Sequence, residues 1–172
     1  MIGFYPYLIS SLPFLEFGQS PPWSEDDFLG LVARYVSLAD YAIIENLVKD
    51  KQPPEKHPVV EKWNNFEVAL RNELARVRAA RKRVSFEKYL RLAKEEGPNL
   101  SDVVAHALRN PNPIEVEKAL DLLRWDFLNQ LSFRNCFDLA AIVVYALKLR
   151  ILWRWEKIKK ADSEALLRSL LK

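Results

Sequence analysis

The sequence predicts an all-α protein, an irregular bundle of about seven or eight helices preceded by an irregular N-terminal arm. Apolar residues make up 49% of the 172 residues, which is enough for a core. Only four glycines are present, whereas sandwiches, barrels and phosphate-binding loops need glycine at turns and close approaches. The ten prolines lie mostly between segments of helical periodicity, where they separate the helices.

Residues 1–23 are expected to form the arm and to pack on the helical part through aromatic side chains. Pro6 and Pro13 lack backbone donors, so they disfavour a helix or a central strand here. The segment has no basic region followed by a small-residue cleavage site, and we interpret it as mature sequence. Residues 24–172 then form the helical domain, either as one body or as two lobes, 24–110 and 111–172.

The first three helices follow from caps and periodicity. Ser24 with three acidic residues after it predicts a helix start, and a second helix is expected over 39–49. Pro53-Pro54 and Pro58 then interrupt the chain. The third helix has the clearest apolar stripe, which consists of Val59, Trp63, Phe66, Leu70, Leu74 and Val77.

The later helices are marked by serine and proline. Ser85 predicts a fourth helix over 85–96, and Ser101 a short fifth helix over 101–109. Pro113 suits the first turn of a sixth helix, which is expected to end at residue 131. A seventh helix is expected over 137–160, followed by a short final helix capped by Asp162-Ser163.

The most hydrophobic stretch, residues 136–153, is predicted to be helical, with residues 136–152 in the core and the end from Trp153 onward as a contact surface. It carries Asp138, Lys148 and Arg150, whereas a membrane span needs roughly 20 residues with few or no charges. The single cysteine, Cys136, can form no internal disulfide and indicates a reducing compartment. We therefore expect a cytoplasmic protein, with any membrane contact limited to the inner face of the cell membrane.

No pattern for catalysis, a cofactor or a metal is found, so we expect a protein that is not an enzyme. His57 and His106 lack the partners of a zinc site, and glycines at 3, 18, 30 and 97 permit no phosphate-loop motif. The acidic residues at 25–27 and at 115 and 117 are interpreted as partners of helix N-termini.

Two basic stretches suggest an interaction surface instead. Residues 71–83 have six basic residues and one acidic residue, and residues 148–160 have the same balance together with two tryptophans. Tryptophan and arginine are enriched at protein interfaces, and the mixture also suits an anionic membrane surface. The predicted interface residues are Arg71, Arg78, Arg81, Lys82, Arg83, Trp153, Arg154 and Trp155. The alternative is a solvated helix face, and nucleic acid is not expected because no recognition motif accompanies the charge.

Several segments resemble a known family. The arm contains the run Tyr5-Pro6-Tyr7-Leu8-Ile9-Ser10-Ser11-Leu12-Pro13, with Phe17-Gly18 and Pro21-Pro22 after it. The second half contains residues 117–128, 137–139 and 145–155. Together these resemble a family of uncharacterised bacterial proteins encoded among the subunits of V-type (A/V-type) rotary ATPases. More distantly, residues 41–47 and 117–121 resemble the cap subunit of those ATPases, an all-helical protein that joins the central stalk to the proteolipid ring.

The resemblance implies a function without a catalytic site. The first hypothesis is a non-catalytic accessory or central-stalk component, similar to the cap subunit, of a bacterial V-type ATPase that transports ions or protons. Its partners would be ATPase subunits of the stalk and the proteolipid ring, while ATP hydrolysis belongs to other subunits. The alternative hypothesis is an independent scaffolding or regulatory module that forms a homodimer through its C-terminal helix.

Overall fold

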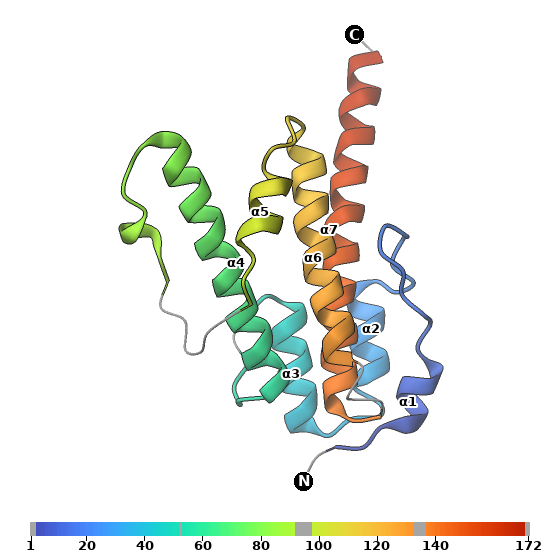
Figure 1. Ribbon diagram of the computed structural model, residues 1–172. Helices are drawn as coiled ribbons and strands as arrows, with labels where there is room; N and C mark the ends of the chain where they lie inside the picture. Colours follow the sequence, from blue (N-terminus) through green and yellow to red (C-terminus); the bar gives the residue numbers. More distant parts are fainter. Residues whose placement is uncertain (1–2, 52, 92–97, 133–136, 171–172) are drawn as a thin grey trace. The chain divides into compact units, whose positions relative to one another are not determined.

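The computed structural model describes residues 3–51, 53–91, 98–132 and 137–170, and for 162–170 it describes the backbone only (Figure 1). The described residues form no strand, and a single isolated bridge pairs Phe4 with Asp138. The elements in chain order are α1 (Pro6–Ser11), α2 (Glu25–Val32), α3 (Leu38–Val48), α4 (Pro58–Lys82), the 3-10 helix η1 (Glu87–Tyr89), α5 (Ser101–Ala107), α6 (Pro113–Ser132) and α7 (Leu139–Leu170). The predicted all-α class is confirmed.

The chain divides into two compact units. Unit 1 comprises residues 1–55 and 125–172, and unit 2 comprises residues 56–124. The expected lobes, 24–110 and 111–172, were each continuous in sequence, whereas unit 1 is assembled from both ends of the chain. The arm belongs to unit 1, and α6 contributes residues to each unit.

Unit 1 is built around the first half of α7. Eleven of its residues are buried hydrophobics: Leu139, Ala140, Ile142, Val143, Val144, Ala146, Leu147, Leu149, Ile151, Leu152 and Trp153. Helices α2 and α3 pack with it, and the fully buried ring of Phe28 stacks on Tyr145 with centroids 5.7 Å apart. No helix in the described ranges has both the length and the apolar character needed to cross a membrane.

The arm is more regular than the sequence suggests. Pro6 was expected to resist a helix, yet it occupies the first turn of α1, where a missing N–H donor costs nothing. Backbone hydrogen bonds hold the arm to the start of α7, from Tyr5 N to Phe137 O at 2.8 Å and from Leu139 N to Gly3 O at 3.2 Å. The expectation of an irregular arm is therefore wrong for α1.

Unit 2 is organised by α4, whose predicted stripe is buried at five of its six positions, while Val77 is partly exposed. Val59, Trp63, Phe66, Leu70 and Leu74 are buried, and Trp63 stacks on Phe66 with ring centroids 5.9 Å apart. Helix α5 packs on α4 (Figure 1). At the start of α6, Asn112 accepts the Ile114 N–H at 3.0 Å, next to a proline at the first helical position.

Two predicted helix boundaries are wrong. In the described part of 85–96 only η1 forms, because the Asn72 amide bonds both backbone groups of Arg91, at 2.9 and 2.8 Å, and so replaces helical partners. No break occurs at Asp162-Ser163, since α7 continues to Leu170. Residues 139–170 contain no glycine or proline, and Asp or Ser inside a helix costs only about 0.7 kcal/mol. The predicted burial of Cys136 lies outside the described residues.

Candidate functional site

The buried face of α7 includes Trp153, which the sequence suggested as a contact residue. Its side chain is 4% exposed, and its Nε1 donates to the carbonyl of Trp23 at 2.7 Å. Trp153 follows Ala146 by seven residues and Leu149 by four, so it lies on their buried face. The prediction of a surface contact is therefore wrong for Trp153, while Arg154 is exposed and Trp155 is partly buried.

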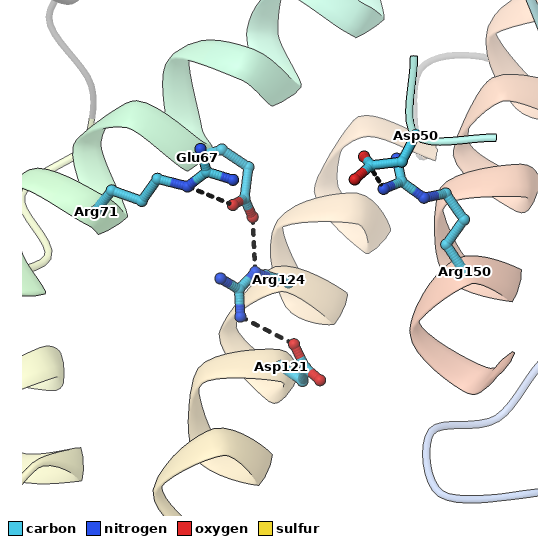
Figure 2. A network of polar contacts seen from close by, with 6 residues as sticks. All are labelled: Asp50, Glu67, Arg71, Asp121, Arg124 and Arg150. Atoms are coloured by element: carbon cyan, nitrogen blue, oxygen red, sulfur yellow. Dashed lines mark hydrogen bonds and ion pairs between the residues drawn. The ribbon is translucent and has the colours of Figure 1, made fainter. Parts of the chain in front are cut away.

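The cations of the second basic stretch bind within unit 1. Lys157 pairs with Glu25 of α2 at 2.7 Å, and Lys159 donates to the carbonyl of Gly18 at 3.2 Å. Gly18 has a φ of 89°, a conformation that suits glycine. Arg150 pairs with Asp50 (Figure 2). These contacts fasten the arm, α2 and the end of α3 to α7, so this stretch has a structural role.

A hollow of about 330 Å³ lies among these residues in unit 1, and its lining includes Glu25, Asp50, Arg150, Arg154 and Lys157. Two of its cations are already paired with its two carboxylates. Lys49 also lines the hollow and pairs with Glu45, so at least three of the four lining cations are already paired with carboxylates and the hollow offers no argument for a charged ligand. Nor do three His, Cys, Asp or Glu side chains gather anywhere in the described residues in a way that could hold a metal ion.

Unit 2 contains a buried charge network on α4 and α6. Figure 2 shows Arg124 between two carboxylates, with Nε 2.6 Å from Glu67 and Nη1 2.9 Å from Asp121. The Asp121 side chain is 1% exposed. Burial lowers the pKa of Arg124, but ion pairing and hydrogen bonding with Glu67 and Asp121 outweigh it, and the pKa ends above its ordinary value. The network therefore holds the two helices together and keeps its cation charged.

Sequence reasoning missed this network, although part of it has a local signature. Asp121 and Arg124 are three residues apart on α6, and Glu67 and Arg71 are four apart on α4. Arg71, a predicted interface residue, lies at the edge of the network, 3.8 Å from Glu67 and with its side chain 53% exposed.

The first basic stretch is divided between structural and unpaired residues. Arg81 donates to the carbonyl of Leu108 at the end of α5. Arg83 ends α4 in the left-handed conformation, with a φ of 55°. Arg78, Lys82 and Arg83 are exposed, and in the part of the chain that the structure describes their side chains make no ion pair or hydrogen bond. These three cations remain available to a partner.

Exposed apolar side chains, two of them aromatic, follow these cations in the sequence. Val84, Phe86 and Tyr89 are exposed, Tyr89 by 62%. The Arg76 guanidinium lies 5.8 Å from the centroid of the Phe86 ring. The contacts of Arg76 with Phe86 and of Asn72 with Arg91 make the segment after α4 run back along that helix. We call the set Arg78, Lys82, Arg83, Val84, Phe86 and Tyr89 the basic–aromatic surface.

The charge of this region is unusual for the chain. Residues 76–91 have seven basic residues and one acidic residue, Glu87, which is a net charge of +6, whereas the whole chain has +3. The remaining residues therefore have a net charge of −3. The basic–aromatic surface is a local positive region on an otherwise acidic chain.

Comparison with known proteins adds one likeness. Residues 92–172 match the family model of a protein of unknown function (DUF2764). Neither a curated protein nor a solved structure matches the chain. The matched region contains α5, α6 and α7, so it includes parts of both units.

Proposed function

We propose that this chain is a non-catalytic accessory or central-stalk component of a bacterial V-type ATPase, similar to the all-helical cap subunit, that acts through protein–protein contacts. One observation carries the proposal. Arg124, Arg150 and Lys157 of α6 and α7 pair with carboxylates of other elements, whereas the basic–aromatic surface combines three exposed cations with exposed aromatic side chains. Arginine next to aromatic side chains is typical of protein interfaces.

The ATPase itself is proposed from the resemblance of the arm and of the helical second half to proteins encoded with its subunits. An all-α chain fits that comparison, because the cap subunit is all-helical. The alternative, a homodimer through the C-terminal helix, loses one of its two tryptophan anchors, since Trp153 is buried within unit 1.

Co-purification tests the proposal. The full chain, tagged and expressed in cells that encode both it and a V-type ATPase, should bring down ATPase subunits at a reproducible ratio. An unrelated basic helical protein of similar size, tagged in the same way, is the control. If the tagged chain enriches the ATPase subunits no more than the control does, the proposal is wrong.

A further inference from the structure

We infer that the basic–aromatic surface binds an acidic amphipathic helix of a partner protein. The inference rests on the proposed function, since that partner is taken to belong to the V-type ATPase. It extends the proposed function by naming the surface of this chain that makes the contact and the kind of partner segment that it binds.

The spacing of the cations on α4 fits a helical partner. Arg71, Arg78 and Lys82 fall within about 40° of one another around the helix, and Lys82 lies about 80° from Asn72. At 1.5 Å per residue, Arg78 and Lys82 are about 6 Å apart along the axis. Carboxylates four residues apart on a partner helix have the same separation. Such a helix would pair its acidic side chains with this row.

The neighbouring aromatic segment supplies the apolar half of the surface. Asn72, which bonds Arg91, lies about 80° from Lys82 around the helix, so the end of the segment that carries Tyr89 is on the flank next to the row of cations. Arg76, which lies near the Phe86 ring, is farther around, about 120° from Lys82. A helix with acidic residues on one flank and apolar residues on the next matches both features.

Two other ligands fit less well. Single-stranded nucleic acid needs aromatic faces on which bases stack, but the Phe86 ring already has the Arg76 guanidinium near its face. An extended anionic membrane would need a wide positive surface, whereas the rest of unit 2, outside residues 76–91, has seven basic and nine acidic residues. A short acidic helix of a partner would contact only the positive region formed by residues 76–91.

The test compares two double charge reversals in the full chain, with the purified V-type ATPase as the probe. Arg78→Glu with Lys82→Glu removes two cations of the surface. Lys56→Glu with Lys62→Glu makes the same change in net charge at two other exposed positions of unit 2. Far-UV circular dichroism should show that both variants keep the helical content of the wild type.

We expect the Arg78/Lys82 variant to bind the ATPase about tenfold more weakly than wild type, and the Lys56/Lys62 variant to bind as wild type does. A photo-crosslinker placed at Tyr89 should then attach to an acidic helical segment of one of the ATPase subunits. The wild-type affinity should also fall with added salt.

Three results would overturn the inference. If the Arg78/Lys82 variant binds as tightly as wild type, the surface is wrong while the proposed function stands. If wild type itself does not bind the ATPase, both fail. If wild type binds single-stranded RNA, or vesicles of phosphatidylglycerol and phosphatidylethanolamine, and the Arg78/Lys82 variant loses only that binding, the partner class is wrong.

Discussion

Arg124 is the cation that two poorly hydrated carboxylates share, and its replacement by alanine tests how the charge network stabilises unit 2. The Asp121 side chain is 1% exposed, and those of Glu67 and Arg124 are each 14% exposed. Removing one partner of a buried pair costs about 3–5 kcal/mol, because a charge is left without compensation. Domains are stable by about 5–15 kcal/mol, so Arg124→Ala should remove a large fraction of the stability of unit 2.

Arg71→Ala is the matched control, because Arg71 contacts the same Glu67 from an exposed position, at 3.8 Å. A pair of this kind contributes about 0.5 kcal/mol or less. The two variants therefore remove a cation from one carboxylate at two levels of burial. Combining Arg124→Met with Asp121→Asn and Glu67→Gln should recover part of the loss, since no buried charge then remains unpaired.

Urea denaturation followed by far-UV circular dichroism gives the free energy of unfolding of each variant, and hydrogen exchange locates the loss in α4 and α6. If Arg124→Ala and Arg71→Ala both cost less than about 1 kcal/mol, the network is worth no more than an exposed ion pair and the reasoning is refuted.

Three further outcomes are expected. Trp153→Ala should lower the free energy of unfolding, measured by chemical denaturation, by about 3–5 kcal/mol, because removing a buried indole leaves a cavity. Trp155→Ala should lower it clearly less. Equal losses for the two variants would contradict the burial of Trp153. Burial raises the pKa of Tyr145 from 10.0 to about 12. The stabilisation from keeping this phenol neutral in the folded state is therefore complete below pH 10 and is lost as the pH rises through about 12. Absorbance titration of tyrosinate should show that Tyr145→Phe removes one late-ionising group, and an unchanged curve would count against this. Asn72→Ala should speed hydrogen exchange at the Arg91 amide while leaving that of α4 unchanged, because only the former bonds to Asn72; an unaltered rate at Arg91 would argue against the contact.

Local signals predicted the helices well. The Ser24 side chain accepts the Asp27 N–H at 3.1 Å, as an N-cap should, and five of the six stripe residues on α4 are buried as expected. Such features depend on residues within one or two helical turns of one another, so they can be predicted from the sequence alone. The wrong expectation after α4 has a nonlocal cause, since in the described residues 85–91 the backbone of Arg91 bonds to Asn72, which is thirteen residues before Ser85.

The candidate site could be predicted only in part. The basic composition of the first stretch was visible, but which cations stay unpaired depends on contacts such as that of Arg81 with α5. Trp153 and Trp155 look alike in the sequence, and only the packing of α2 and the arm on α7 separates them. The network around Arg124 needs α4 and α6 side by side, which no local pattern indicates.

The division of unit 1 between the two ends of the chain has a consequence for synthesis on the ribosome. Unit 2 is continuous and can fold once its last residue has emerged, but Pro13 must wait for Tyr145, which follows it by 132 residues. At typical translation speeds this delay is on the order of ten seconds. During that time the apolar faces of α2 and α3, including Phe28 and Ile44, have no α7 to cover them. These early helices are thus the part of the nascent chain on which chaperones should act.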